Sequence, residues 1–231
     1  MFERTELLIG NDNLIKLQSS KIALFGLGGV GGFAFEALVR AGVGEIHIFD
    51  NDTFDKTNLN RQILCTNDTI GKNKVDIAES RAKSINPNIK IVKYKMFVLP
   101  DNINNIDFTI FDYVIDAIDT ITAKLEIIKK CNSLHIPIIS CMGTGNKLDS
   151  TKLKITDISK TNYCKLAKVM RKLCKENNIN HLTVLYSEEE SRNIIVNDEK
   201  KHSPASISYL PAIAGLMLAE YVIKELICLE N

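Results

Sequence analysis

The chain has 231 residues, of which 45% are hydrophobic and 25% are charged, and its formal net charge is +1. This composition is typical of a globular protein and leaves room for one large α/β domain. A net charge near zero argues against a protein that binds nucleic acid over its whole surface, although it allows a local basic face. No basic segment leads into an apolar run at the N-terminus, and the apolar stretch 207–219 is too short to span a bilayer. We therefore expect a cytoplasmic protein without a membrane partner.

The six cysteines are scattered, and no two of them stand at the spacing of a metal-binding pair. A chain of this size without secretion features rarely depends on a disulfide framework. We therefore expect neither structural zinc nor disulfides, and most of these thiols should be small buried hydrophobes.

Strand and helix signals alternate along the first two thirds of the chain. The short apolar segments that predict strands are 21–25, 45–50, 89–94, 113–119 and 136–140. The segments between them that predict helices are 33–41, 72–85 and 120–134. Such alternation indicates a Rossmann-like, doubly wound α/β fold with a mostly parallel sheet and helices on both faces.

The pattern changes after residue 143. Segments 152–158 and 181–187 predict two further strands, with a basic helix at 163–176 between them. A polar loop at 188–203 precedes a long, largely apolar helix at 205–229. We expect a single domain over residues 1–231, with a nucleotide-binding part at about 20–143 and a C-terminal part at about 144–231 that extends the sheet.

A glycine-rich turn follows the first predicted strand directly and opens a helix. Gly26, Gly28 and Gly31 fit G-x-G-x-x-G, with Gly29 between them. These glycines permit a tight turn, close approach of the backbone to phosphate, and close helix–strand packing. Asp50 ends the second strand about twenty residues later, where an acid can bind ribose hydroxyls. The motif alone does not distinguish NAD, FAD and ATP.

Polar side chains beyond this motif fall at loop ends on the expected carboxyl edge of the sheet, where α/β folds place their ligands. They are Asp52, Asn58, Arg61, Gln62, Lys74 and Asp119. Cations near a triphosphate neutralise the charge that develops as a phosphorus–oxygen bond breaks. A carboxylate such as Asp119 can hold Mg²⁺ between phosphate oxygens. This set exceeds what a dinucleotide needs and favours nucleotidyl transfer.

The segments GLGGVGG, FDNDTFDKTNLNRQ, GKNKVD and DAIDT resemble, in order, the motifs of the ubiquitin-activating-like superfamily, the ThiF, MoeB and HesA proteins. The resemblance implies a homodimeric, ligase-type enzyme that uses ATP to adenylate a carboxylate and releases pyrophosphate. It implies that Asp50 binds ribose and that Asp119 binds Mg²⁺. Arg61 and Lys74 would contact the phosphates, and Arg4 would act in the site of the other subunit.

Three C-terminal segments, 157–175, 184–190 and 205–226, resemble the tRNA threonylcarbamoyladenosine dehydratase family, also called the TcdA family. This resemblance implies ATP-dependent dehydration, by cyclisation, of threonylcarbamoyladenosine next to the anticodon of tRNA. Branches that activate sulfur-carrier proteins hold zinc with two Cys-x-x-Cys pairs, which this sequence lacks.

Two other functions stay open at this point. One is adenylation of the C-terminus of a ubiquitin-like sulfur-carrier protein, and the other is a nicotinamide-dependent oxidoreductase or a dinucleotide-binding sensor. The sequence also leaves open a monovalent cation in the site and a cysteine desulfurase or sulfur-acceptor partner. Cys65 follows Arg61 within the polar loop, and we expect it to be a bystander.

The basic helix is the predicted tRNA contact. Its cations recur at near-helical intervals with no acid before Glu176, and they are Lys160 just upstream, Lys165, Lys168, Arg171, Lys172 and Lys175. Its apolar residues should occupy the opposite side, and they are Leu166, Val169, Met170 and Leu173. A helix with one cationic face suits a phosphate backbone.

Overall fold

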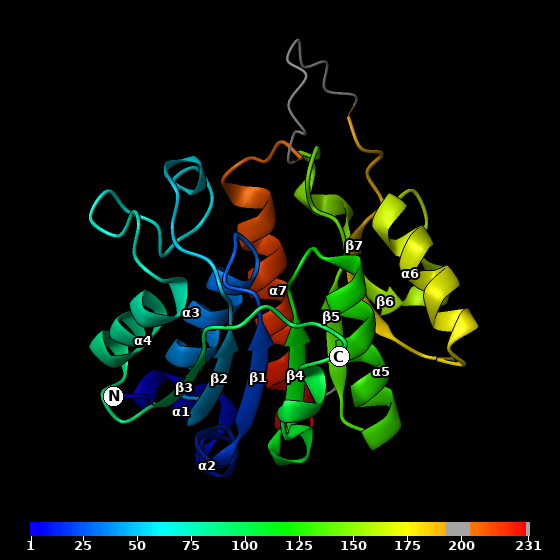
Figure 1. The fold of residues 1–231 in the computed structure, drawn as a ribbon. Coiled ribbons are helices and arrows are strands. Elements are labelled where there is room, and N and C mark those ends of the chain that lie inside the picture. The colour runs from blue at the N-terminus through cyan, green and yellow to red at the C-terminus, as the bar shows by residue number, and fades with distance from the viewer. Residues whose placement is uncertain (193–203, 230–231) are drawn as a thin grey trace.

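One seven-stranded sheet runs through the chain in the order β3-β2-β1-β4-β5-β7-β6 (Figure 1). The computed structural model describes residues 1–192 and 204–229. All neighbouring strands pair in parallel except β6, which is antiparallel to β7. The strands are β1 (Lys21–Phe25), β2 (Glu45–Phe49), β3 (Lys90–Tyr94), β4 (Tyr113–Asp116), β5 (Ile138–Cys141), β6 (Leu153–Asp157) and β7 (Thr183–Ser187).

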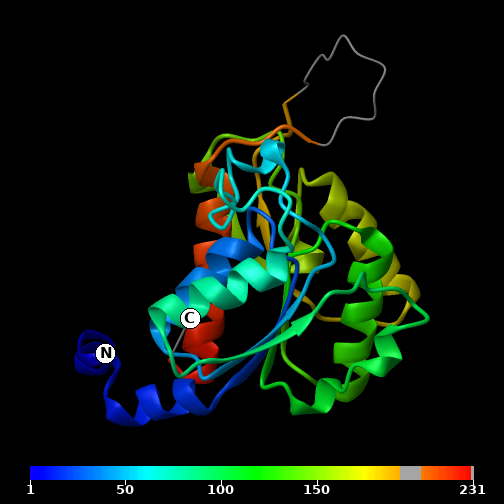
Figure 2. The same cartoon turned by 60° about the vertical axis from the view of Figure 1, so that its left-hand side comes forward.

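Helices cover both faces of the sheet. α3, α4 and α7 pack on one face, and α5 and α6 pack on the other (Figures 1 and 2). Two further helices, α1 and α2, precede the first strand. The bounds are α1 (Glu3–Ile9), α2 (Asn11–Ser19), α3 (Gly31–Ala41), α4 (Lys74–Ile85), α5 (Ile121–Leu134), α6 (Lys165–Glu176) and α7 (Tyr209–Leu226).

Alternation along β1 explains why the sheet needs two layers of helices. Ile22 and Leu24 are buried against the α3 and α7 side, whereas Ala23 and Phe25 are buried with residues of α5 on the other side. Successive side chains of a strand point to opposite faces, so an uninterrupted apolar run must be covered on both sides. The apolar run 22–25 therefore places β1 in the interior of the sheet.

The predicted fold class is confirmed, and most predicted elements end within two residues of the observed ones. The fourth strand was predicted to reach Asp119, but it ends at Asp116. The Asp116 carboxylate accepts a hydrogen bond from the Ile118 N–H at 3.3 Å, which turns the chain early. α1 and α2 were not predicted, and most of the predicted loop at 188–203 lies outside the described residues. Among the described helices, none has the length and apolar character needed to span a bilayer.

The contact between α3 and α7 gives a first prediction. A Cβ added at Gly215 of α7 would lie 2.2 Å from the Val30 carbonyl oxygen and 3.0 Å from the Ala34 nitrogen. Both atoms are backbone atoms, one of α3 and one of its N-cap residue Val30. We therefore expect Gly215→Ala to destabilise the fold by about 1–3 kcal/mol, as overpacking does. The melting temperature should then fall by roughly 2–4 °C for each kcal/mol of stability that is lost.

The neighbouring residue provides the control. Leu216 is 48% exposed, so Leu216→Ala should change stability by less than about 0.5 kcal/mol. Equal melting temperatures for the two variants would contradict the close helix packing.

Candidate active site

The carboxyl ends of four parallel strands, β1, β2, β4 and β5, open into one cavity of about 800 Å³. This is the edge of the sheet where α/β folds bind ligands. The predicted site residues that line the cavity are Gly26, Gly28, Gly29, Asp50, Asp52, Asn58, Arg61, Gln62, Lys74 and Asp119. The structure therefore brings together side chains from segments that are far apart in the sequence.

The glycine-rich turn forms the floor at the start of α3. Gly26 has a φ of 90°, which a residue with a side chain rarely adopts. A Cβ at Gly31 would lie 1.8 Å from the Gly26 carbonyl oxygen, so Gly31 allows the helix to begin against the strand; it does not line the cavity. Gly28 faces open space, with no atom within 4 Å of its Cβ position. Gly28 is thus where a ligand can approach the backbone.

Asp50 is the best-connected acid of the site. Its Oδ2 accepts the Leu27 N–H at 2.7 Å, and its Oδ1 accepts the Asp52 N–H at 2.9 Å. The Lys74 ammonium lies 3.8 Å from Asp50 Oδ2 and 2.8 Å from Asp52 Oδ2. Burial raises the pKa of the Asp50 carboxyl above its usual value, and the Lys74 charge opposes that shift. The fold therefore holds a carboxylate where ionisation is unfavourable.

The polar loop after β2 is ordered by its own side chains. Asp55 and Asn58 form a capping box around a single turn of 3₁₀ helix, Lys56–Asn58. Arg61 Nη1 donates to the Thr57 carbonyl oxygen at 3.0 Å and to Asn60 Oδ1 at 2.9 Å. These bonds hold the guanidinium group beside the glycine turn, since a Cβ at Gly29 would lie 3.2 Å from Arg61 Cγ.

Two groups in the cavity lack partners among the residues that the structure describes. Gln62 is 6% exposed, and its Oε1 has no hydrogen bond within residues 1–192 and 204–229. A buried acceptor without a donor is costly, which indicates that a bound ligand or ion supplies one. The Asp119 carboxylate is exposed in the turn after β4, and no described residue pairs with it. Both are free for a ligand.

The side chains of the cavity can hold Mg²⁺ only together with a bound nucleotide. Across the part of the chain that the structure describes, no group of three His, Cys, Asp or Glu side chains is arranged to hold a metal ion. Mg²⁺ commonly takes one or two carboxylates and completes its shell with phosphate oxygens and water. Asp119 can supply one such carboxylate, so the site fits Mg²⁺ that arrives with a nucleoside triphosphate.

Sequence reasoning missed two walls of this cavity. One is apolar and consists of Phe49, Ile118 and the segment Met96–Val98, next to β2 and β4. The other is the segment Cys141–Gly145, which follows β5 and faces Leu166 of α6 and Ser206. The second wall could have been found, because Gly143-Thr144-Gly145 follows a predicted parallel strand and must lie at the same edge.

Arg4 is not part of the cavity in its own chain. It is exposed on α1, a helix with no buried residue. Phe2 contacts the Gly42 position just before β2, which places α1 beyond the amino ends of the strands, opposite the glycine turn (Figures 1 and 2).

α6 departs from the predicted pattern at two positions. Lys165, Lys168, Lys172 and Lys175 are exposed, as is Lys160. The Arg171 guanidinium group instead bonds to Thr161, with Nη1 2.8 Å from the carbonyl oxygen and 2.6 Å from Oγ1. Val169 was predicted on the apolar side but is 41% exposed, because the buried residues are Ala167, Met170 and Cys174. The basic face therefore consists of lysines.

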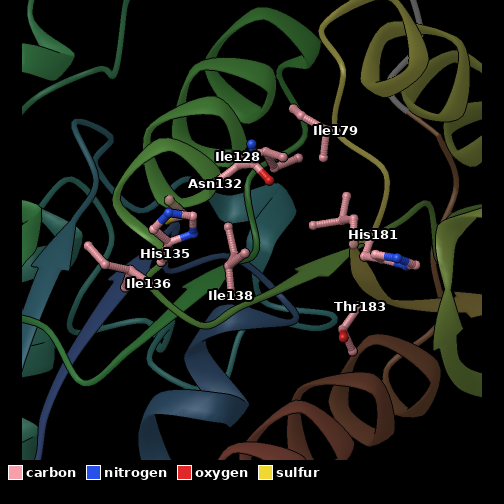
Figure 3. Close-up of a pocket in the computed structure, with 10 residues that line it drawn as sticks. Ile128, Asn132, His135, Ile136, Ile138, Ile179, His181 and Thr183 are labelled. Atoms are coloured by element: carbon pink, nitrogen blue, oxygen red, sulfur yellow. The ribbon is translucent and has the colours of Figure 1, made fainter.

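Other chemical groups lie away from the site. Cys65 is buried and donates to the Asp55 carbonyl oxygen at 3.5 Å, and burial raises the pKa of its thiol. A second cavity of about 220 Å³ lies at the amino ends of β5 and β7. Figure 3 shows His135 and His181 on opposite sides of it, with Ile138 between them. Neither feature faces the large cavity.

The model of the ThiF family matches residues 2–230. The chain belongs to the ThiF family. This ThiF-family chain is 41% identical, over 98% of its length and 94% of the relative, to the tRNA threonylcarbamoyladenosine dehydratase of Bacillus subtilis (strain 168). It is 36% identical, over 75% of its length and 65% of the relative, to the enzyme of the same name from Escherichia coli (strain K12).

Solved structures agree. The E. coli tRNA N6-threonylcarbamoyladenosine dehydratase in complex with AMP superposes with a TM-score of 0.90 and 29% identity, covering 98% of this chain and 94% of that one. The same enzyme in complex with ATP gives a TM-score of 0.88 over 98% and 93% of the two chains. These ThiF-family structures share the sheet and both layers of helices with this chain.

The raised pKa of Asp50 predicts a pH-dependent stability difference. A carboxyl whose folded pKa exceeds its unfolded value binds more protons in the folded state, so its contribution to stability falls as pH rises through that interval. Asp50→Asn removes this pH-dependent contribution to the free energy of unfolding. The variant should therefore gain stability relative to the parent protein as pH rises from about 3 to 7, the range in which carboxyls titrate.

The measurement is the difference in melting temperature between the two proteins across this range, in which the other titrating groups cancel. A flat difference, or one of opposite sign, would show that Asp50 is not buried at an energetic cost.

Proposed function

We propose that the protein is an ATP-dependent tRNA threonylcarbamoyladenosine dehydratase. The observation that carries the proposal is a single cavity that holds a glycine turn with a ribose-binding type of acid, two cations and an unpaired carboxylate. Near-full-length likeness to dehydratases of this name supports the choice of substrate. An oxidoreductase does not need Arg61, Lys74 and Asp119 around one cavity, because a nicotinamide ring carries its own reactivity.

The proposed reaction has two steps. An oxygen of the threonyl carboxylate attacks the α-phosphorus of ATP, the bond to the β-phosphate bridge breaks, and pyrophosphate leaves. The ureido nitrogen of the same nucleotide then attacks the activated carbonyl carbon, loses its proton and closes a ring, and AMP departs with one carboxylate oxygen. The substrate loses one water overall, and no enzyme nucleophile is needed.

The residues act by positioning and by charge. Asp50 and the N–H groups at the start of α3 would hold ribose and phosphate at the glycine turn. Arg61 and Lys74 would offset the negative charge that grows on the phosphates as pyrophosphate leaves, with Asn58 and Gln62 in support. Asp119 would hold Mg²⁺, which when bound neutralises phosphate charge. Fixing both reactants in one cavity supplies much of the rate.

A second copy of the chain would complete the site. Arg4 is too distant to act in its own cavity, because α1 lies at the amino ends of the strands. Leu7 and Leu8 on the same helix are each 86% exposed, which is unusual for adjacent leucines unless a partner covers them. We infer a homodimer in which α1 packs on the other subunit and presents Arg4 to its cavity.

The exposed lysines of α6 would contact tRNA. α6 and the cavity wall Cys141–Gly145 are neighbours, because Leu166 of α6 lines the same cavity. A phosphate backbone bound along the lysines would thus run beside the cavity into which the modified adenosine enters.

Mass spectrometry of nucleosides tests the function. Threonylcarbamoyl-modified tRNA incubated with the protein should lose one water from that nucleoside only when ATP is present. Asp119→Ala or Arg61→Ala should lower this turnover by at least about 100-fold, because Arg61 would offset phosphate charge directly and Asp119 would hold the Mg²⁺ that does so. Asp68→Ala, an exposed acid outside the cavity, is the matched control and should remain active.

Unchanged nucleosides with ATP would refute the substrate. Pyrophosphate exchange that depends on a small carrier protein would instead favour the sulfur-carrier alternative.

Delivery of Arg4 in trans predicts complementation between inactive variants. Arg4→Ala and Asp119→Ala proteins should each be inactive alone. After mixing and subunit exchange, heterodimers contain one intact site, so activity should recover to about a quarter of the parent value if the subunits exchange at random. No recovery despite proven heterodimers would show that Arg4 does not act across the interface.

Lysine substitutions on α6 should weaken tRNA binding and its salt dependence. Each phosphate contact that is lost should lower the slope of log affinity against log salt by about 0.7–0.9. We expect this for Lys168→Ala and Lys172→Ala, with ATP affinity unchanged, and not for Lys16→Ala on α2. Equal salt slopes for all three variants would exclude α6 from the tRNA interface.

A further inference from the structure

A fully buried ion pair lies directly behind the cavity. Lys124 of α5 and Asp116 at the end of β4 are both 0% exposed, and Lys124 Nζ lies 2.7 Å from Asp116 Oδ2. Ser140 of β5 donates to the same carboxylate oxygen at 2.6 Å and lies 3.2 Å from Lys124 Nζ. The ammonium also donates to the Cys141 carbonyl oxygen at 2.9 Å. We call these three side chains, Lys124, Asp116 and Ser140, the buried triad.

Stability alone does not explain this triad. Withdrawing two charges from water costs about as much as their attraction returns, so replacing a buried pair with apolar residues of similar volume is often neutral or stabilising. A buried pair in the middle of an apolar sheet therefore calls for a structural task that apolar side chains cannot perform. Directional hydrogen bonds to specific backbone groups are such a task.

The triad bonds to two segments that line the cavity. On one side, Asp116 Oδ1 accepts the Ile118 N–H and so shapes the turn that carries Asp119. On the other side, Lys124 holds the Cys141 carbonyl group, where the wall Cys141–Gly145 begins. β4 and β5 pair with each other only as far as Asp116 and Ser140, although Cys141 still pairs with Leu185 of β7. Beyond that last pair, the triad joins the segment after β4 to the segment after β5.

Contacts with the glycine turn extend this arrangement. The Ala117 N–H donates to the Phe25 carbonyl oxygen at 2.8 Å, and a Cβ at Gly26 would lie 2.8 Å from the Ala117 carbonyl oxygen. The turn after β4 therefore lies against the phosphate-binding end of β1. A change in the direction of Asp116 would be transmitted to Asp119 through only two intervening residues.

We propose that Lys124, with Asp116 and Ser140, is a positioning residue that fixes the Asp119 turn against the wall Cys141–Gly145, and so sets where a nucleotide-bound Mg²⁺ is held. This inference rests on the proposed function, because it takes Asp119 as the carboxylate that holds the metal. Lys124 does not line the cavity and acts only through the backbone that it orients.

Calorimetric binding of ATP, with Mg²⁺ and with EDTA, tests the proposal independently of turnover. In the parent protein Mg²⁺ should tighten ATP binding, and Asp119→Ala should remove that effect. The double variant Asp116→Leu with Lys124→Met replaces both charged side chains by apolar ones of similar shape. It should melt near the parent temperature, because apolar replacement of a buried pair is often neutral. The ratio of its ATP affinity with Mg²⁺ to that with EDTA should fall by about tenfold or more. Its ATP affinity in EDTA should stay within about threefold of the parent value, because only the contact of the misplaced Asp119 is lost.

Ser140→Ala provides a milder variant that keeps the ion pair, and it should lose part of the Mg²⁺ effect. The matched control is Lys129→Met, which removes a partly exposed ion pair with Glu126 at 2.8 Å on the same helix and should behave as the parent. If the double variant fails to fold, Ser140→Ala alone decides.

Three results would overturn the inference. They are a full Mg²⁺ effect in the triad variants, equal weakening of ATP binding with and without Mg²⁺, and no Mg²⁺ effect in the parent protein. The dehydratase assay is separate. If the parent protein shows the Mg²⁺ effect and the triad variants lose it, but the modified nucleoside stays unchanged, the proposed substrate is refuted and the positioning role stays intact.

Discussion

The hydrogen bonds of Asp50 are the interaction on which the rest of the site depends. One carboxylate joins the end of β2 to the glycine turn through Leu27, to the start of the polar loop through Asp52, and to α4 through Lys74. Burial makes its charge unfavourable, so the fold retains it at a cost in stability. Such a cost is expected where a carboxylate serves a ligand rather than the fold.

Parallel strands convert this local arrangement into a site. Because β1, β2, β4 and β5 all point the same way, the segments that follow them converge on one cavity, although these segments are far apart in the sequence. The cavity then divides by chemistry. Its lining combines an apolar part at Phe49 and Met96–Val98, which suits a flat base, with the charged groups and with the wall Cys141–Gly145. A nucleotide and a second, RNA-borne substrate can thus meet in one cavity.

The sequence predicted what local patterns encode. The strand β1 and the glycine turn follow from a buried apolar run joined to a G-x-G-x-x-G spacing, and Asp50 follows from its place at a strand end. Contacts between segments that are distant in the sequence could not be predicted from these patterns. No spacing rule pairs Lys124 with Ser140, and nothing in the periodicity of α6 reveals that Arg171 bonds to Thr161. The helices α1 and α2 were missed because α1 buries none of its residues and α2 buries only Leu14 and Leu17.

The central claim is that the cavity joins a carboxylate oxygen to the α-phosphorus of ATP, and isotope transfer tests it most directly. Modified tRNA with ¹⁸O in the threonyl carboxylate would be converted in the presence of ATP, and the nucleotide products would be analysed by mass. The account predicts one labelled oxygen in AMP and none in pyrophosphate. Label in inorganic phosphate together with ADP, or unlabelled AMP from a completed reaction, would contradict it.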